Sequence, residues 1–218
     1  MKKIIYRLYF AFILVAHWNL SAQELLRNGT FAQGGTLQNV YVQHGILEWW
    51  GSTGKNESPP DVHTAFTGYW GVQQHPYEGD TYVGLVCRPN GTSEFIYQKL
   101  QTPLMPGKHY QFAVYASTSA DYISATRETP TIKRNFTDPC RIVISGKKKH
   151  KGDLDILAKS SPITWLEWQK IWLDFEVDEP YKFFVISVEI APVTQQTGQE
   201  SRKPAGHVLL DKASLQLK

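Results

Sequence analysis

The sequence predicts an all-β protein that folds as a single two-sheet antiparallel jelly-roll β-sandwich. The first observation is alternation, because polar and apolar residues exchange at every second position through Phe95–Gln101 and Tyr110–Ser117. Successive side chains of a strand point to opposite faces, so this period of two indicates strands with one buried face. The second is the high aromatic content, with seven Trp, eleven Tyr and ten Phe, which β-sandwiches accommodate readily. No repeat, second domain or helix-length amphipathic segment is apparent.

The segment between these two strands is expected to cross from one sheet to the other. Two prolines and a glycine interrupt Leu100–Lys108, because proline lacks an N–H group and glycine tolerates a positive φ. The link is too long for a tight hairpin turn. We therefore expect Leu104 to lie in the core, and Phe112 and Val114 to be buried between the sheets.

Further strands are expected where the same alternation returns between turn signals. They are Tyr82–Val86, Arg141–Ser145, Gln169–Val177, Tyr181–Ile190 and His207–Leu217. In Gln169–Val177 the charged residues between the apolar positions indicate one wet face, which carries Trp172. Leu47–Tyr82 and Ser119–Pro139 are rich in turn residues, and we expect both to be mostly surface loop.

The N-terminal residues 1–22 have the pattern of a secretory signal peptide. A basic start precedes the apolar run Leu8–Val15, and a small-residue exit ends at Ala22. The run is too short to span a bilayer comfortably, although a retained anchor is the alternative. Residues 23–218 are then the exported domain, without a membrane span, in the periplasm, at the cell surface or secreted. The net charge of +3 is too small to indicate nucleic acid as a partner.

The two cysteines, Cys87 and Cys140, each lie at the boundary of an expected strand. Disulfides persist in exported proteins, so the pair is a disulfide candidate. Whether they pair depends on whether their Cα atoms approach within about 7 Å.

Several short stretches resemble one family of domains. These include GKHYQFAVYAS at Gly107–Ser117, ELLRNGTFAQGG at Glu24–Gly35 and HVLLDKASLQL at His207–Leu217. They resemble secreted galactose-binding-like and carbohydrate-binding-module-like jelly-roll domains, in particular those of Bacteroidetes cell-surface, gliding-motility and adhesion-type proteins. The resemblance implies an exported binding module whose partner is a carbohydrate or a cell-envelope component.

The resemblance also bears on calcium, which many of these relatives bind as a structural ion. The relatives carry a glutamate where this chain has Ala32, whereas Asp211 matches their second carboxylate position. Calcium requires six or more oxygen ligands. Asp211 is therefore a weak calcium candidate, and no cofactor is expected.

Aromatic and polar residues near the two ends of the long loop Leu47–Tyr82 are the candidate ligand-binding residues. Both loop ends must approach the sandwich, so the rings could surround a shallow surface while polar groups supply directional hydrogen bonds. The candidates are Trp49, Trp50, Asp61, His63, Trp70, Gln74 and Tyr77. Tyr115 and Trp172 are further candidates on outward strand faces. The competing interpretation is that the rings only hold the loops against the sandwich.

Two other functional classes remain open. The first is a structural or adhesion component of the envelope that binds protein. The second is a polysaccharide-active enzyme, for which the loop offers Glu48, Asp61, Glu78, Asp80, His63 and His75. These residues lack a recognisable spacing such as HExxH, so no catalytic or metal-binding residue is assigned. The basic turn Lys147–Lys151 fits an anionic glycan, phosphate or lipopolysaccharide, or simply a solvated hairpin tip.

Overall fold

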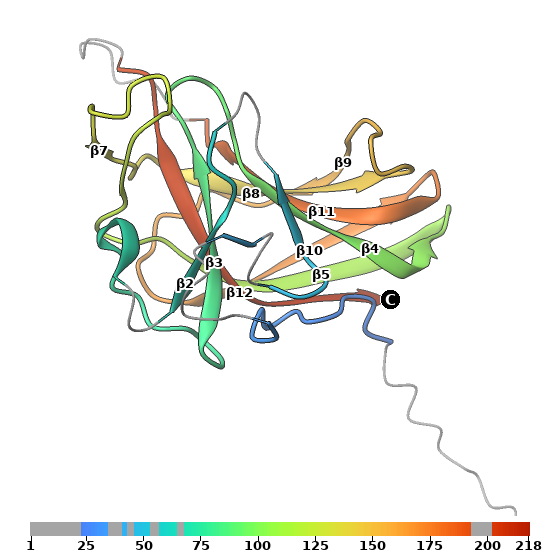
Figure 1. Cartoon of the computed structure of the whole chain (residues 1–218). Helices are drawn as coiled ribbons and strands as arrows, with labels where there is room; N and C mark the ends of the chain where they lie inside the picture. The colour runs from blue at the N-terminus through green and yellow to red at the C-terminus, as the bar shows by residue number, and fades with distance from the viewer. Residues whose placement is uncertain (1–22, 35–40, 43–45, 53–56, 65–67, 193–201) are drawn as a thin grey trace, which may run out of the picture.

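The structure is a computed structural model that describes residues 23–34, 41–42, 46–52, 57–64, 68–192 and 202–218. The expected signal peptide, residues 1–22, lies outside the described residues. Two five-stranded antiparallel sheets pack face to face (Figure 1). The first sheet has the order β1(Trp50–Ser52), β4(Phe95–Leu104), β11(Tyr181–Ile190), β8(Cys140–Lys147), β9(Asp155–Lys159). The second has the order β10(Gln169–Val177), β5(Lys108–Ser117), β12(Gly206–Leu217), β3(Thr81–Cys87), β2(Asp61–Thr64).

This arrangement confirms the predicted fold class, a two-sheet antiparallel jelly roll. The expected crossing between the central strands is also confirmed, because β4 belongs to the first sheet and β5 to the second. Gly107 adopts a φ of 69° where the chain turns between them. Leu104, just before this turn, is fully buried, so the crossing is anchored in the core as expected.

The main core lies between the two sheets and is built from the inward positions of every long strand. Phe112 and Val114 of β5 have no exposed surface, as predicted. The ring of Phe112 lies 5.3 Å from that of Phe184 on the opposite sheet. Fully burying a side chain of this size stabilises the fold by about 1.5–3 kcal/mol. The alternation read in the sequence therefore identifies the buried faces of these strands.

A second, smaller apolar cluster lies on the outer face of the second sheet. Tyr82 and Val86 of β3 point outward, yet both are buried because Tyr122 and Phe136 cover them. These two rings come from the 118–139 segment, which also contains the short strands β6(Ile123–Ser124) and β7(Arg134–Asn135). The segment is thus a cover over one end of the sheet, rather than a free surface loop.

His207 of β12 fastens this cover to the sheet. Its Nε2 accepts a hydrogen bond from the backbone N–H of Ser119 at 2.8 Å, and its Nδ1 lies 2.6 Å from the backbone oxygen of Phe136. These contacts fix the neutral ring with its proton on Nδ1, which donates to the Phe136 oxygen. Burial lowers the pKa of His207 to about 4, so the neutral form persists at neutral pH.

The expectation that Leu47–Tyr82 is mostly loop holds for most of its described residues, but the range also contains short strands that were not predicted. The described part of this range contains β1, β2 and the 3-10 turn η1(Tyr69–Gly71). Both strands are three or four residues long and lie at sheet edges, β1 against β4 and β2 against β3. Such short edge strands carry too few alternating positions to reveal a period of two. The described part of the chain has no helix with the length and apolar character that crossing a membrane requires.

Candidate functional site

The structure separates the seven side chains that the sequence grouped at one loop. Trp49 is only 2% exposed, its ring is 5.4 Å from Phe31, and its Nε1 donates to the backbone oxygen of Asn28 at 3.0 Å. Trp50 faces outward on the first sheet and stacks on Tyr97. The expectation that these two rings share one surface is therefore wrong, because neighbouring residues of an extended chain point to opposite sides.

Asp61 and His63 lie on β2 beneath the 118–139 cover. The hydroxyl of Tyr122 donates to Asp61 Oδ2 at 2.5 Å, and the His63 ring stacks on Tyr82 with centroids 5.2 Å apart. Burial raises the pKa of Asp61 well above its usual range and lowers that of His63 to about 3. Both side chains are buried, so they do not face a ligand at the surface, contrary to expectation.

The three remaining candidates, Trp70, Gln74 and Tyr77, lie at three separate places. Trp70 has a φ of 61°, which is unusual for a bulky residue, and it lines a hollow of about 450 Å³ with Glu57 and Arg127. Gln74 lines a separate hollow of about 260 Å³, and its backbone oxygen accepts from the Tyr82 hydroxyl at 2.7 Å. Tyr77 lies apart from both, on the open part of the second sheet, against Tyr115. Ligand binding by these residues stays a prediction.

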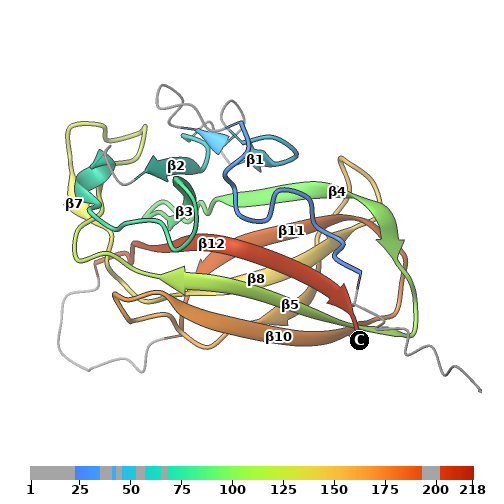
Figure 2. The ribbon, with the colours of Figure 1, turned by 90° about the horizontal axis from the view of Figure 1, so that it is seen from below.

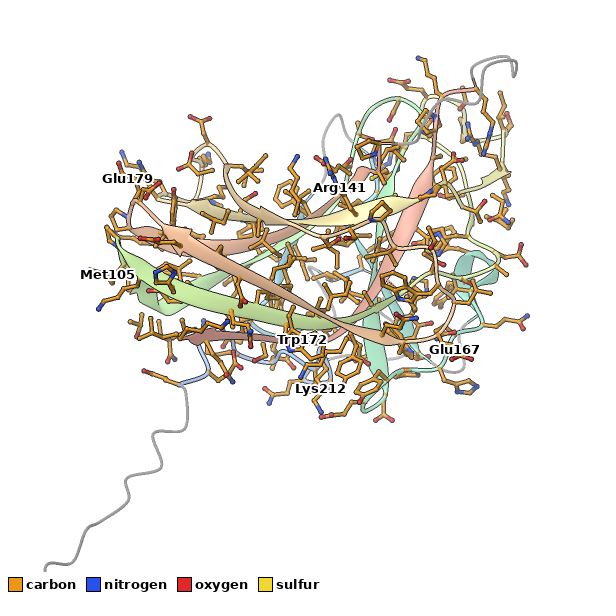
Figure 3. The ribbon with its side chains drawn as sticks, turned by 180° about the vertical axis from the view of Figure 1, so that it is seen from behind. Met105, Arg141, Glu167, Trp172, Glu179 and Lys212 are labelled. Carbon is orange, nitrogen blue, oxygen red and sulfur yellow. The ribbon has the colours of Figure 1, made fainter. Side chains whose placement is uncertain are left out.

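The open part of the second sheet carries a group of rings and charges that we call the Tyr77–Trp172 surface. It consists of Tyr77, Tyr115, Lys170, Trp172 and Lys212. Figure 2 shows that β10, β5 and β12, which hold most of it, run side by side along one layer of the sandwich. Figure 3 shows the labelled Trp172 and Lys212 on this face.

The register of the strands explains why the Trp172 side chain is exposed. On β10 it lies opposite Ala113 of β5, which in turn lies opposite Ser214 of β12. These two small residues leave the indole without a bulky neighbour in its own row, and Trp172 is 55% exposed. Lys170, two residues earlier on the same face, lies opposite Tyr115. Its Nζ is 5.2 Å from the Trp172 ring and 5.8 Å from that of Tyr115, within reach of a cation–π interaction.

Tyr77 comes from the loop before β3 and is fixed by the buried carboxylate of Asp211. Asp211 Oδ2 accepts from the backbone N–H groups of Tyr77 at 2.8 Å and Glu78 at 3.0 Å, and Oδ1 accepts from that of Lys212. The Tyr77 ring consequently stacks on Tyr115 of β5, with centroids 3.5 Å apart and planes 16° from parallel. Tyr77 remains 41% exposed, so part of the side chain is accessible to a ligand.

Charged and amide groups surround these rings. Lys212 Nζ is 5.7 Å from the Tyr77 ring and pairs with Glu78 at 2.5 Å. On the other side, Asp174 accepts from Lys218 Nζ at 2.8 Å and from Gln111 Nε2 at 2.9 Å. The hydrogen bonds from Lys218 and Gln111 lower the pKa of Asp174. The surface therefore combines flat apolar faces with hydrogen-bonding groups of both signs.

Asp211 was also the weak calcium candidate. Burial raises its pKa to about 6, while the three backbone N–H groups act in the opposite direction. These three donors already occupy most of the acceptor sites of this carboxylate. Among the described residues no three His, Cys, Asp or Glu side chains come together as a metal group. Calcium binding remains an untested expectation, and the observed role of Asp211 is to position the Tyr77 loop.

The proposed acidic and thiol groups can now be located as well. Glu48 forms an ion pair with Arg27 at 2.7 Å, whereas Glu78 forms one with Lys212. The two carboxylates therefore have different partners and do not form a pair. Cys87 ends β3 and Cys140 begins β8 on the opposite sheet. Both are free, buried thiols, and contact with the Cys87 side chain, together with burial, raises the pKa of Cys140. Their pairing in a disulfide remains a prediction.

The geometry defines a jelly-roll β-sandwich with an exposed aromatic surface on one sheet. No family model matches the sequence, and the comparison with curated proteins finds no match. Among solved structures, the chain is similar to the enzymatically active domain of tailspike protein 4 from bacteriophage CBA120. The TM-score is 0.51 at 12% identity, over 89% of this chain and 21% of that one.

Two further solved structures are similar to this chain. An arabinose-bound GH51 α-L-arabinofuranosidase gives a TM-score of 0.50 at 12% identity, over 89% of this chain and 26% of that one. A CBM22-1 xylan-binding domain from Paenibacillus barcinonensis gives a TM-score of 0.47 at 12% identity, over 90% of this chain and 95% of that one. The chain thus spans about a fifth to a quarter of the tailspike and arabinofuranosidase chains. At this identity the likeness concerns the fold.

The sequence had identified Trp172 and Tyr115 as outward-facing rings, but not their association with Tyr77. The alternation of β10 places Trp172 on the wet face, and this signal was sufficient for that residue. The link to Tyr77 depends on Asp211, which is 134 residues away in the chain. No local pattern could reveal that contact.

Proposed function

We propose that this protein is an exported, non-catalytic module that binds glycans through the Tyr77–Trp172 surface. The observation that carries the proposal is the pair of open rings, Tyr77 and Trp172, held on the outer face of one sheet among charged and amide groups. Planar rings suit the flat apolar faces of sugar rings, and the surrounding groups suit their hydroxyls. Because one fold serves many functions, the surface rather than the fold supports this ligand class.

The rigidity of the surface supports binding. Tyr115 and Trp172 lie on strands that pair along nearly their full length, and Tyr77 is fixed by the Asp211 carboxylate. A site that is already ordered loses little conformational freedom when the ligand arrives. Exposed aromatic groups of this kind usually mark a contact with a partner.

The charges support a binding role over hydrolysis. A glycosidase requires one carboxylic acid with a raised pKa and a second carboxylate facing it across the substrate. On this surface the pKa of Asp174 is lowered, and Glu78 is paired with Lys212. The one carboxyl group here with a raised pKa, that of Asp211, is fully buried. The basic and apolar start of the sequence supports export, where a glycan partner would be met.

The proposal is tested by affinity electrophoresis of the purified protein in gels that contain xylan, β-glucan, mannan or arabinan. We expect at least one neutral glycan to retard the wild type, and Trp172→Ala and Tyr77→Ala to abolish the retardation. Ile156→Ala on β9, which removes an exposed apolar side chain from the other sheet, is the matched control. Retardation of both surface variants equal to wild type would overturn the assignment of this surface.

The alternative, an envelope component that binds protein, has one observation in its favour. An apolar hollow of about 790 Å³ lies at the end of the sandwich where β4 crosses to β5, and its lining includes Met105, Tyr110 and Leu217. Met105 and Leu217 are about half exposed. If no glycan binds the wild type, crosslinking to envelope proteins in wild type and Met105→Ser is the test of this second function.

A further inference from the structure

The first sheet carries a second group of rings on its outer face, opposite the Tyr77–Trp172 surface. We call it the Trp50–Tyr97 surface, and it consists of Trp50, Phe95, Tyr97, His150 and Phe183. Trp50 on β1 lies directly opposite Tyr97 on β4, and the two rings stack with centroids 5.8 Å apart. Phe183 on β11 is 6.4 Å from Tyr97. Figure 2 shows β1 and β4 on the side of the sandwich away from β5 and β10.

The rings of this group differ in exposure along the row. Trp50 is 43% exposed, whereas Tyr97, Phe95 and Phe183 are half-buried. Three neighbouring strands hold the rings, and strands lie about 4.8 Å apart, so the rings extend over roughly 10 Å. Such a track is long enough to contact more than one ring of a polymeric ligand.

The turn between β8 and β9 brings positive charge to this track. Its His150 folds back over the sheet, with Nε2 3.0 Å from the Tyr97 hydroxyl and its ring 5.8 Å from that of Phe183. The turn is closed by a hydrogen bond from the Gly152 N–H to the Lys149 oxygen at 3.0 Å. Because His150 is anchored on the rings, the backbone of the turn that carries Lys149 and Lys151 lies next to the aromatic track.

The lysines differ in how far they are neutralised. Lys147 is almost buried, with Nζ 5.5 Å from the Tyr97 ring. Lys148 pairs with Glu179 at 3.5 Å, and both are about half exposed. Lys149 and Lys151 are exposed and form no ion pair with any residue that the structure describes. Asp153 and Asp155 share a shallow hollow of about 240 Å³ with Lys148 and Lys149. The four lysines of the turn outnumber these two aspartates and Glu179 by one, so the group carries a single net positive charge.

We infer that the Trp50–Tyr97 surface is a second binding site, and that it takes an acidic polysaccharide, whose sugar rings carry carboxylate or sulfate groups. The aromatic track provides stacking for the sugar faces, and the ammonium groups of Lys149 and Lys151 provide partners for the anions. A neutral glycan would leave these charges without a role, and a purely electrostatic ligand would leave the exposed Trp50 ring without one. The inference goes beyond the proposed function, because this site lies on the opposite sheet and shares no residue with the first.

The test is isothermal titration of the purified protein with polygalacturonate, chondroitin sulfate and neutral dextran at low and at high salt. We expect the two acidic polymers to bind, with affinity falling as salt screens the charges. Dextran should neither displace the acidic polymers nor bind the Trp172→Ala variant. K149E/K151E reverses two charges at an exposed turn, so its affinity should fall on the order of tenfold. Trp50→Ala should also weaken binding, whereas Trp172→Ala on the other sheet should leave it unchanged.

Several results would overturn the inference. They are the absence of binding to either acidic polymer, wild-type affinity in both Trp50→Ala and K149E/K151E, and loss of binding in Trp172→Ala. A duplex DNA fragment and vesicles containing anionic lipid serve as further arms. If either binds as tightly as the acidic polymers and without regard to Trp50→Ala, the turn is a general polyanion site and the glycan assignment fails. Retention of neutral-glycan binding in K149E/K151E would show separately that the first surface is intact.

Discussion

Asp211 holds Tyr77 in place by accepting its backbone N–H at 2.8 Å, although the two residues lie on different elements, 134 positions apart. This contact fixes the ring of Tyr77 over Tyr115 and completes the aromatic surface of the second sheet. A buried carboxylate that the family resemblance would assign to calcium therefore has a second explanation, the ordering of the loop that carries Tyr77.

Replacing Asp211 should consequently affect both stability and binding. Asp211→Ala leaves the backbone N–H groups of Tyr77, Glu78 and Lys212 without their acceptor, which should cost about 1–3 kcal/mol of unfolding free energy. We expect glycan affinity to fall as far as in Tyr77→Ala. Chemical denaturation and titration measure the two effects. If Asp211→Ala keeps wild-type affinity, the carboxylate does not position Tyr77.

The core of the sandwich should be far more sensitive than its aromatic surface. Phe112→Ala removes a fully buried ring that packs on Phe184, and we expect a loss of about 3–5 kcal/mol. Trp172→Ala removes a larger but half-exposed ring and should change the unfolding free energy by about 0.5 kcal/mol or less. Urea denaturation compares the two, and equal losses would show that Trp172 has a structural role.

Stability should fall in mild acid through His207. Its pKa is about 4 in the fold and 6.5 when unperturbed. Between these values the unfolded chain takes up a proton that the fold excludes, so stability decreases as the pH falls from about 6.5 to 4. The full effect of such a shift is about 3 kcal/mol. Buried His63, with a pKa of about 3, acts in the same direction, whereas the titration of Asp211, whose pKa is raised to about 6, acts in the opposite direction. A variant at His207 is therefore needed to isolate the contribution of His207.

His207→Asn retains a donor for the Phe136 oxygen but cannot titrate. Unfolding free energies measured at several pH values should therefore fall less steeply with acid in this variant than in the wild type. His109→Asn, at an exposed position, is the control. Parallel curves for the wild type and His207→Asn would contradict the assignment.

The thiols of Cys87 and Cys140 should pair under oxidising conditions. They lie in contact across the two sheets, and a disulfide would tie β3 to β8 with a gain of about 2–4 kcal/mol. Thiols are titrated in protein isolated without reductant and then denatured. The expected count is none, and two reactive thiols would show that the pair stays reduced.

The alternation of polar and apolar residues was sufficient to predict the fold and its buried faces, because each long strand has one inward face. Gln98 illustrates the limit, since it occupies an inward position as expected yet is a polar side chain with no exposed surface. It is accommodated by hydrogen bonds with the backbone of Arg27 on both sides of its amide. Burial of β3 on both faces was not predictable, since the cover that includes Tyr122 and Phe136 is otherwise polar.

The site was predicted less well, for physical reasons. Trp49 and Trp50 are adjacent in the chain, so only one of them could face outward. Asp61 and His63 have the polarity of surface residues, but they lie on an edge strand beneath the cover. Trp172 was recognisable because its strand is long and regular, whereas Tyr77 depends on a distant carboxylate.

The most direct test of the central claim is NMR of protein labelled with 5-fluorotryptophan, with each signal assigned by a Trp→Phe variant. On addition of a neutral glycan that binds, the Trp172 signal should shift or broaden, while the signals of Trp50 and the buried Trp49 should stay in place. A glycan that binds without moving the Trp172 signal would contradict the account.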